Sequence, residues 1–509
     1  MSETRSTILK LHPEDNVVLA LVDIPGGSEP APGVFCKQRI PAAHKIASEP
    51  IPAGAPIVKY GQIIGFASTD IPAGVHVHTH NVLFKDFPRD SQPSSGKIPP
   101  QETLPPEKRS CFNGILRPDG RAGTRNYIGI IPTSACSSQV AVEIARSIGK
   151  IDMEPFTHVD GIVALPHKDG CGMLDRDEGL SMLQRTVAGY ADNPNFASVV
   201  LVSLGCEVNQ PEALCEMLAS TAWKPVVSID IQKLGGARAA INAGHAAVMD
   251  MLTTADQARR QSLSAEHLVV GLECGGSDAY SGISANPALG AAVDLLVQNG
   301  GTAILSETPE IYMAEHLLAR RAANPRVHDD LLDIIDWWET YSSTRGQTIN
   351  NNPTPGNKAG GLTTIAEKSL GAVAKGGTSP LNAVYRYAEK VNVGGLVFMD
   401  SPGYDPVSIT GKVAGGATLI CFTTGCGSVS GCKPSPVLKL ASNSNLYLRL
   451  EKDMDINCGS ILDGETSVET MGRRIFERIL STASGSPTKS EQQGFGDMEF
   501  SPWLIGGVL

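Results

Sequence analysis

The sequence predicts an α/β protein that begins with a small all-β domain. Up to about residue 88, short β-rich runs are separated by Pro/Gly turns, which is typical of antiparallel strands. Beyond residue 110, continuous aliphatic runs alternate with helical stretches, a pattern that favours largely parallel sheets covered on both faces. A hydrophobic share of 41% excludes a disordered chain, because enough apolar surface is available to form cores.

The first segment, 1–88, is predicted to be the all-β domain. Its strands are expected at 16–24, 57–68 and 76–84. Residues 89–110 are rich in Pro, Ser and charge, with almost nothing to bury, and are therefore expected to form an interdomain linker.

The rest of the chain is predicted to form two α/β domains, over 111–345 and 346–509. A Gly/Pro/Asn-rich break at 350–362 places the boundary near residue 346. The buried strands are expected at 127–133, 161–165, 198–204, 268–272, 302–305, 395–399 and 417–423. The helices are expected at 139–148, 211–219, 287–298, 312–321, 329–341 and 468–480.

Charge and composition narrow the functional class. The chain has 42 Lys and Arg against 53 Asp and Glu, a net charge of −11, so it lacks the basic footprint of a nucleic-acid-binding protein. No apolar run reaches the ~18 residues of a membrane span, and the first residues lack the apolar stretch of a signal peptide. Eleven cysteines, an odd number, do not indicate a disulfide framework here. We expect a cytoplasmic protein with a small-molecule substrate and no membrane partner. The sequence leaves open whether it forms a homo-oligomer.

Several predicted strands run directly into a small-residue loop that carries a cysteine. In open parallel sheets, ligands bind outside the carboxyl ends of the strands, so we expect the thiols to converge on one site. The alternative is that cysteine is simply a favoured small buried residue. The cysteines are Cys136, Cys171, Cys206, Cys274 and Cys426.

Three histidines alternate at 76, 78 and 80. A strand would send all three imidazoles to one face, and imidazole rows suit zinc or iron. Surface histidines at a strand end are the alternative.

Two His–Lys pairs lie in loops, His44-Lys45 and His167-Lys168. A lysine beside other cations or in a dry pocket can have its pKa lowered enough to act as a base. Most lysines are instead solvated, and the sequence leaves both interpretations open.

Three Gly-rich loops carry further candidates for ligand binding. Arg125 lies in DGRAGTRN and could pair with a substrate carboxylate, or cap a neighbouring helix. Lys358 and Asn357 lie in PGNKAGG, which suggests a close backbone approach to a ligand. The turn with Ser277 and Asp278 leads towards a helix amino terminus, where backbone amides can bind an anion.

Together these motifs resemble the altronate dehydratase family, the sugar-acid dehydratases that also include galactarate dehydratase. The motifs are HVHTHN, DGRAGTRNY, HKDGCG, LGCE, LECGGSDAYSGISANPALG, NPTPGNKAGG and MDINCGSILDGE. The resemblance spans nearly the whole chain, from an SAF-like β-clip domain to the final segment FSPWLIGGVL. It implies hydro-lyase chemistry, a requirement for Fe²⁺ or Mn²⁺, and a reducing environment.

The resemblance implies that an aldonate such as D-altronate is converted to its 2-keto-3-deoxy acid and water with the help of a metal. The HVHTHN motif is closer to the altronate branch of the family. Such a reaction needs a base at C2, and an acid or the metal at the leaving hydroxyl. The candidate acids and bases are His44, Lys45, His167 and Lys358; the candidate substrate-binding residues are Arg125, Ser277, Asp278 and Asn357; the candidate metal ligands are His76, His78, His80, Cys171, Cys206 and Cys274.

Three alternatives stay open. The substrate could be galactarate or another aldarate or aldonate. The metal could be an iron–sulfur cluster on three of the strand-end cysteines. The chain could also bind a sugar acid without converting it.

The chain departs from the family at two positions. Ala43 precedes His44 where the family usually has glycine, and Cys426 stands where the family usually has arginine. Loss of the arginine deletes a fixed cation with five donors, so we expect an altered choice of substrate.

Overall fold

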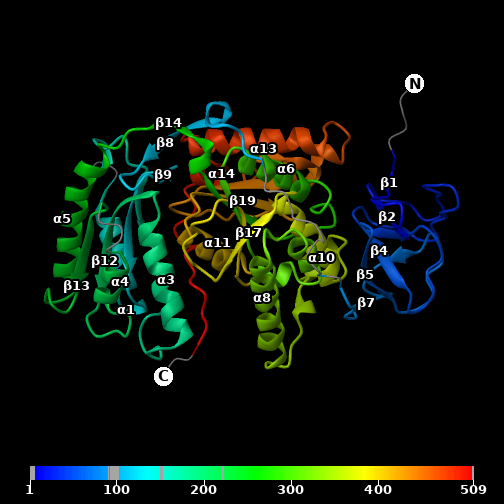
Figure 1. The fold of residues 1–509 in the computed structure, drawn as a ribbon, viewed down its shortest axis with the longest axis horizontal. Helices are drawn as coiled ribbons and strands as arrows, with labels where there is room; N and C mark the ends of the chain where they lie inside the picture. The colour runs from blue at the N-terminus through cyan, green and yellow to red at the C-terminus, as the bar shows by residue number, and fades with distance from the viewer. Residues whose placement is uncertain (1–5, 90, 92–101, 150–152, 219–222, 507–509) are drawn as a thin grey trace.

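The computed structural model describes residues 6–89, 91, 102–149, 153–218 and 223–506. It has three domains in a row along the long axis, with the N-terminal β domain at one end and the C-terminal domain in the centre (Figure 1). The predicted fold class is confirmed. The central part of the predicted linker 89–110 lies outside the described residues. Within the described ranges, no helix is both long and apolar enough to cross a membrane.

The N-terminal domain consists of two small antiparallel sheets. Its strands are β1 (Ile8–Leu9), β2 (Val17–Ala20), β3 (Lys45–Ala47) and β6 (His76–Val77) in one sheet, and β4 (Pro56–Lys59), β5 (Gln62–Ala67) and β7 (Val82–Leu83) in the other. The predicted strand over 76–84 is wrong. Its residues form β6, a turn and β7, because Asn81 accepts from the amide of His78 and donates to the carbonyl of His76.

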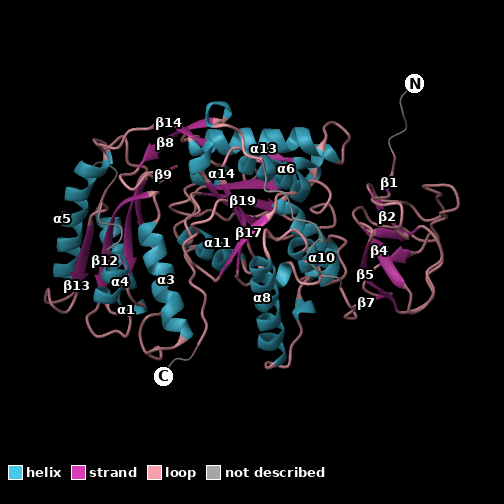
Figure 2. Ribbon diagram, in the orientation of Figure 1, coloured by secondary structure: helices cyan, strands magenta, loops and turns pink. Residues whose placement is uncertain are grey.

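The middle domain is a four-stranded parallel sheet with helices on both faces (Figure 2). Its strands, in spatial order, are β11 (Gly161–Ala164), β10 (Tyr127–Pro132), β12 (Phe196–Ser203) and β13 (Val226–Asp230). Helices α1 (Ala135–Ser147) and α5 (Ala237–Ala255) cover one face, and α3 (Glu178–Asp192) and α4 (Pro211–Leu218) cover the other. Every residue of β10 and β12 is buried, as expected for strands covered on both sides.

A short antiparallel sheet joins the middle domain to the C-terminal domain. Its strands, in spatial order, are β14 (Gln261–Ser264), β8 (Cys111–Leu116) and β9 (Ala122–Gly123). The chain passes from β14 directly into the third domain.

The C-terminal domain is built on a seven-stranded parallel sheet. Its strands, in spatial order, are β17 (Leu381–Tyr385), β18 (Gly395–Met399), β16 (Thr302–Leu305), β15 (Val269–Cys274), β19 (Leu419–Thr424), β20 (Val437–Ala441) and β21 (Ile456–Asn457). The helices are α6 (Ala285–Gln298), α7 (Glu315–Ala319), α8 (Pro325–Ser343), α9 (Pro355–Ala359), α10 (Ile365–Ala372), α11 (Asp405–Ala414), α12 (Ser444–Arg449), α13 (Val468–Ala483) and α14 (Lys489–Gln492).

The predicted domain boundary near residue 346 is wrong. Strands β15 and β16, which precede that point, belong to the same sheet as β17–β21, so the division between the α/β domains falls between β14 and β15. The Gly/Pro/Asn-rich break at 350–362 is an internal loop that carries α9. Such a composition is typical of any long loop, whether or not it separates domains.

Each parallel sheet has a point where the strand order reverses. From β10 the chain moves to β11 on one side and then to β12 on the other, and from β15 it moves to β16 on one side and later to β19 on the other. The loops that leave such neighbouring strands diverge and open a crevice at the carboxyl edge of the sheet. Functional side chains are therefore expected at the ends of β10 and β12, and of β15 and β19.

A buried ion-pair group attaches the N-terminal domain to the C-terminal domain. Glu367 on α10 accepts from Lys45 Nζ and from Lys59 Nζ, each at 2.8 Å, and all three side chains are at most 2% exposed. Lys45 Nζ also donates to the carbonyl of Gly361 at 2.7 Å. Burial alone would raise the pKa of Glu367, but the two ammonium groups hold it well below its ordinary value. Glu367 is therefore a carboxylate in the folded protein.

Replacing Glu367 with Gln should destabilise the protein by about 3–5 kcal/mol, because two buried ammonium groups lose their counter-charge. The measurement is urea denaturation followed by circular dichroism. The depressed pKa adds stability above the ordinary carboxyl pKa, and this stability is lost as the pH falls below it. The difference between wild type and Glu367→Gln should therefore shrink below about pH 4.3.

A matched control is Glu143→Gln, which removes an exposed carboxylate paired with Arg146 on α1. It should leave the urea midpoint unchanged. An equal midpoint for both variants would mean that the Glu367 ion pairs do not hold the domains together.

Candidate active site

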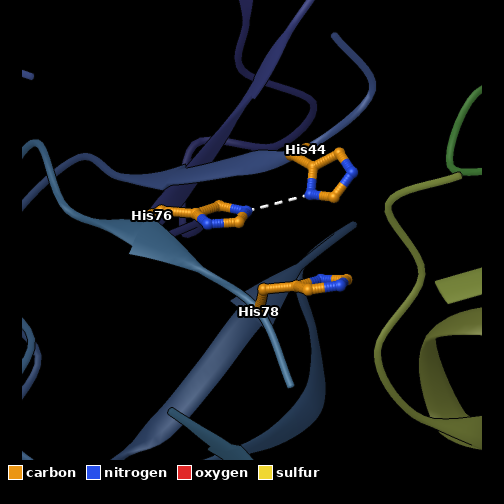
Figure 3. Close-up of side chains that lie close together, drawn as sticks. All are labelled: His44, His76 and His78. Atoms are coloured by element: carbon orange, nitrogen blue, oxygen red, sulfur yellow. Dashed lines mark hydrogen bonds between the residues drawn. The ribbon is translucent and has the colours of Figure 1, made fainter. Parts of the chain in front are cut away.

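Three imidazoles of the N-terminal domain meet where it contacts the C-terminal domain (Figure 3). His44 directly precedes β3, His76 is the first residue of β6, and His78 lies in the turn that follows. His44 Nδ1 and His76 Nε2 are 2.9 Å apart. One nitrogen from each of the three rings lies within 4.8 Å of the others. We call these three residues the histidine group.

All three rings are neutral at neutral pH. Burial lowers the pKa of His44. Burial, followed by the neighbouring histidines, lowers the pKa of His76 to about 3. Burial and then the charge of Lys45 lower the pKa of His78 to about 4. Because metal ligation requires an unprotonated ring nitrogen, the histidines are already in the form that binds a cation.

The protonation of His44 follows from its contacts. Its Nε2 lies 3.1 Å from the carbonyl oxygen of Ala359, which can only accept, so Nε2 carries the proton and Nδ1 the lone pair. A backbone carbonyl that fixes the tautomer in this way is usual for metal-binding histidines. His78 Nδ1 is buried and has no hydrogen-bond partner in the described structure. The residues present therefore fit a divalent cation such as Fe²⁺ or Zn²⁺.

His80 stands apart from this group. It is exposed, and although its ring lies beside that of His76, it is not among the three residues whose ligand atoms all lie within 4.8 Å of one another. The predicted set of His76, His78 and His80 therefore becomes His44, His76 and His78. The prediction assumed a continuous strand, whereas β6 ends at Val77 and His80 lies exposed in the turn that Asn81 closes.

A tight contact between two backbone segments positions His44. Ala43 has φ of 70°, a left-handed conformation that costs about 1–2 kcal/mol for a residue with a Cβ. Its carbonyl oxygen lies where a Cβ on Gly361 would stand, so glycine is required at position 361. This approach presses the loop with Ala43 and His44 against the end of α9.

The loop after β15 packs beside this contact and is hydrogen-bonded to the neighbouring loops. Asp278 accepts from Ser281, Ser442 and Asn443, and burial raises its pKa. Asn357 Nδ2 donates to the carbonyl of Ser277 at 2.8 Å, while its Oδ1 accepts at the start of α9. Ser277, Asp278 and Asn357 thus lie beside the contact between α9 and His44, where they hold the loops in place.

A second cluster of ionisable groups lies inside the C-terminal domain at the ends of β15 and β16. Lys375 Nζ donates to Cys274 Sγ and to Glu307 Oε2, both at 2.7 Å, and Lys368 Nζ donates to Glu310 Oε1 at 2.6 Å. Burial and then Glu307 hold the pKa of Cys274 well above its ordinary value, so the thiol stays protonated. Cys274, Glu307 and Glu310 are close enough for a cation, but lysine ammonium groups already neutralise this cluster.

Two carboxyl groups of this cluster titrate near neutral pH. Burial and then the charge of Glu307 raise the pKa of Asp405 to about 7. Burial and then Glu273 raise the pKa of Glu307 to about 7. Asp405 Oδ2 packs against Gly275 in the loop that also carries Asp278. A proton donor therefore borders the loop after β15.

Sequence reasoning missed Glu307 and Asp405. Each follows a predicted strand within a few residues, as the singled-out cysteines do. The same search at the strand ends, extended from thiols to carboxyl groups, would have found both.

The five strand-end cysteines do not converge, so that prediction is wrong. Their strands belong to two separate sheets. Cys136, Cys171 and Cys206 lie at the carboxyl edge of the middle sheet, and Cys274 and Cys426 lie at the edge of the C-terminal sheet.

The other predicted site residues differ in what their side chains contact. All five guanidinium N–H groups of Arg125 are used within the fold, by Glu491 and by the carbonyls of Thr124, Thr482 and Ser486, so a structural role replaces the predicted contact with substrate. His167 Nε2 donates to the carbonyl of Pro132 and Nδ1 accepts from the amide of Asp169, while burial lowers its pKa to about 4.

Of the predicted acids and bases, Lys45 and His167 are thus occupied by contacts within the fold. Lys45 is fully buried in the ion-pair group of Glu367. Lys358, next to Ala359 on α9, is half-buried, and its Nζ makes no hydrogen bond within the described structure. Lys358, which directly precedes the Ala359 carbonyl that His44 contacts, is therefore the candidate base.

Comparisons with known proteins agree along the whole chain. Residues 6–85 match the altronate/galactarate dehydratase SAF domain, residues 114–256 match the D-galactarate dehydratase/altronate hydrolase second domain, and residues 265–508 match the D-galactarate/altronate dehydratase C-terminal domain. The domain division in these matches agrees with the division between β14 and β15.

Individual relatives are similar over most of their length. Altronate dehydratase of Bacillus subtilis (strain 168) is 34% identical over 97% of this chain and 98% of its own. Galactarate dehydratase (L-threo-forming) of Escherichia coli (strain K12) is 36% identical over 96% of this chain and 94% of its own. The (2R)-sulfolactate sulfo-lyase subunit beta of Chromohalobacter salexigens is 32% identical over 76% of this chain and 96% of its own. The chain belongs to the D-galactarate/altronate dehydratase family.

Proposed function

We propose that this chain dehydrates an aldonate such as D-altronate to its 2-keto-3-deoxy acid, with Fe²⁺ bound by His44, His76 and His78. The observation that carries the proposal is the group of three neutral imidazoles, one with an unpartnered buried nitrogen, at the domain junction of a chain from this family. Altronate, galactarate and sulfolactate, which name the relatives, are all 2-hydroxy carboxylates. Elimination from such an acid is the chemistry that they share.

When bound, a divalent cation supplies a Lewis acid for the carboxylate and 2-hydroxyl of the substrate, which makes the proton at C2 more acidic. Histidines that hold the cation would not take this proton, because their lone pairs would be used as ligands. Lys358 Nζ, in its unprotonated form, would remove it. Asp405, whose pKa near 7 leaves much of its carboxyl group protonated, gives its proton to the C3 hydroxyl, which leaves as water. The enol that remains becomes the 2-keto-3-deoxy acid.

Similarity alone does not choose between altronate and galactarate, because the relatives with these two substrates are 34% and 36% identical. Cys426 is the feature of this chain that bears on the choice. Its backbone amide donates to the carbonyl of Gly276 at 3.0 Å, so position 426 borders the loop after β15. Its thiol is exposed and stands where the family usually has arginine.

Anaerobically purified protein supplied with ferrous ion should form a 2-keto-3-deoxy acid from at least one member of a panel of aldonates and aldarates. A chelator should abolish turnover, and ferrous ion should restore it, because the metal stabilises the charge that develops at C2. Binding of a sugar acid without any keto product would instead identify a binding protein. Full turnover in metal-free protein would contradict the role of the metal.

His78→Ala should lower bound iron and kcat/KM by at least tenfold, whereas His80→Ala, two residues further along and exposed, should change neither by more than about twofold. The reason is that only His78 belongs to the histidine group. Iron content measured by atomic absorption, alongside turnover, checks both variants. Equal losses in the two variants, or a loss in His80→Ala alone, would contradict the assignment of the metal to His44, His76 and His78.

Lys358→Met should reduce kcat by about 10²–10⁴-fold while bound iron stays at the wild-type level, because general-base catalysis contributes that factor. The matched control is Lys233→Met, which removes an exposed lysine of the middle domain. Steady-state kinetics and iron content test the pair. Wild-type kcat in Lys358→Met would exclude Lys358 as the base.

Cys426→Arg should change the ratio of kcat/KM for altronate to that for galactarate by tenfold or more. A charge-assisted hydrogen bond contributes about 1.5–3 kcal/mol, and the arginine adds a planar cation suited to a carboxylate. Both substrates are assayed side by side with wild type and with Cys111→Arg, an exposed cysteine outside the site. An unchanged ratio would mean that residue 426 does not contact the substrate.

A further inference from the structure

Three cysteines gather at the point where the middle sheet reverses its strand order. Cys136 lies in the first turn of α1 after β10, Cys171 in the loop after β11, and Cys206 in the loop after β12. These are three neighbouring strands of one parallel sheet, so their carboxyl ends lie at one edge. All three thiols are free and exposed. Burial and then the neighbouring thiol of Cys171 raise the pKa of Cys136, and the charge of Cys206 reaches the same thiol.

Hydrogen bonds fix the three loops relative to one another without using the thiols. The amide of Ala135 donates to the carbonyl of Asp169 at 2.7 Å, which joins the first loop to the second. The amide of Asn209 donates to the carbonyl of Gly170 at 3.1 Å, and Asn209 Nδ2 donates to the carbonyl of Thr133 at 2.8 Å. The third loop is therefore joined to both others.

A close backbone approach sets the path of the second loop. Gly170 has φ of 91°, and a Cβ there would collide with the carbonyl oxygen of Thr133. Only glycine lets the segment before Cys171 lie against the segment before Cys136. The scaffold is thus built before any ligand binds, which is what a site for a multidentate ligand needs.

The carboxylate of Glu207, next to Cys206, is occupied by hydrogen bonds within its own loop and from Thr133. Glu207 accepts from the amides of Leu204 and Gly205 at 2.9 and 2.7 Å, and from the hydroxyl of Thr133. Although burial raises it, these hydrogen bonds hold the pKa of Glu207 below its ordinary value. Gln232 Nε2, in contrast, donates to Cys206 Sγ at 3.6 Å. Hydrogen bonds to sulfur stabilise the negative charge of thiolate ligands.

The spacing of the thiols distinguishes a single ion from a cluster. A single ion with metal–sulfur bonds of about 2.3 Å keeps its ligand sulfurs within about 4.6 Å of each other. Among the described residues, Cys136, Cys171 and Cys206 do not form a group in which all three sulfurs lie within 4.8 Å of one another. At least one pair of these sulfurs is therefore too far apart to share one ion. A polynuclear centre bridges wider gaps.

We propose that Cys136, Cys171 and Cys206 hold an iron–sulfur cluster as thiolates. The three thiols lose their protons on ligation, and ferrous iron, ferric iron and sulfide supply the rest of the cluster. Three protein ligands leave one iron of a four-iron cluster open to an oxygen ligand from a small molecule. The site lies in a different domain from the histidine group and goes beyond the dehydratase function proposed above.

The test compares wild type with Cys136→Ser, Cys171→Ser and Cys206→Ser after anaerobic reconstitution of the full chain with ferrous iron, ferric iron and sulfide. Wild type should show broad visible absorption and bind iron together with acid-labile sulfide. The acid-labile sulfide bound by each variant should be at least tenfold lower than that bound by wild type. Cys215 is an exposed cysteine on α4 of the same domain, and Cys215→Ser should bind as much sulfide as wild type. His78→Ala, which changes only the histidine group, should also bind as much sulfide as wild type.

A second measurement uses wild type alone and does not depend on how the variants fold. Alkylation followed by mass spectrometry should show Cys136, Cys171 and Cys206 protected in reconstituted protein and modified in untreated protein, with Cys215 modified in both. Protein that takes up no sulfide, iron bound without sulfide, or a triple serine variant that keeps the visible absorption would overturn the proposal. Because these readouts do not involve turnover, failure of the cluster and failure of the dehydratase proposal are distinguishable.

Discussion

The burial of Glu367 between two lysines is the constraint on which the candidate active site depends. A carboxylate is expensive to bury unless cations are placed against both of its oxygens, and here both cations come from the N-terminal domain. The domain is thereby held in one position against α10. His44 directly precedes Lys45, and β3 pairs with β6 so that Ile46 lies opposite His76. Lys45 of the ion-pair group and the three residues of the histidine group therefore lie on, or directly beside, two paired strands.

Both parallel sheets reverse their strand order, but the side chains at the two reversal points differ in their chemistry. Each leaves a crevice at its carboxyl edge where the strand order reverses. In the C-terminal sheet this edge carries carboxyl groups and lysines around Cys274. In the middle sheet it carries three exposed thiols on loops joined by backbone hydrogen bonds. We infer that the family's fold can present two separate inorganic sites on one chain.

The buried elements of the fold were predictable from the sequence. The aliphatic run at 395–399 coincides with β18, and the run at 127–133 differs from β10 by one residue. Strands covered on both faces have a strong local signature, because every residue is apolar. The number of sheets was not predictable. Which strands pair depends on long-range packing, so the five cysteines were assigned to one edge when they belong to two.

The sequence allowed the kinds of residue in the candidate site to be predicted, but not which of these residues lie together in the fold. The histidines at 76 and 78 were found, but His44 joins them across 32 positions through the pairing of β3 and β6, which no local pattern reveals. Arg125 was misassigned because its partner Glu491 lies far along the chain. Lys45 was misassigned for the same reason, since its carboxylate is Glu367.

The central claim is that the N-terminal β domain carries the catalytic iron at the junction of the domains. Anomalous diffraction at the iron absorption edge, from crystals of the full chain loaded with ferrous ion alone, tests this claim most directly. The account predicts an anomalous peak bonded to His44, His76 and His78. A peak among Cys274, Glu307 and Glu310, with none at the histidines, would contradict it and would place the metal in the C-terminal domain.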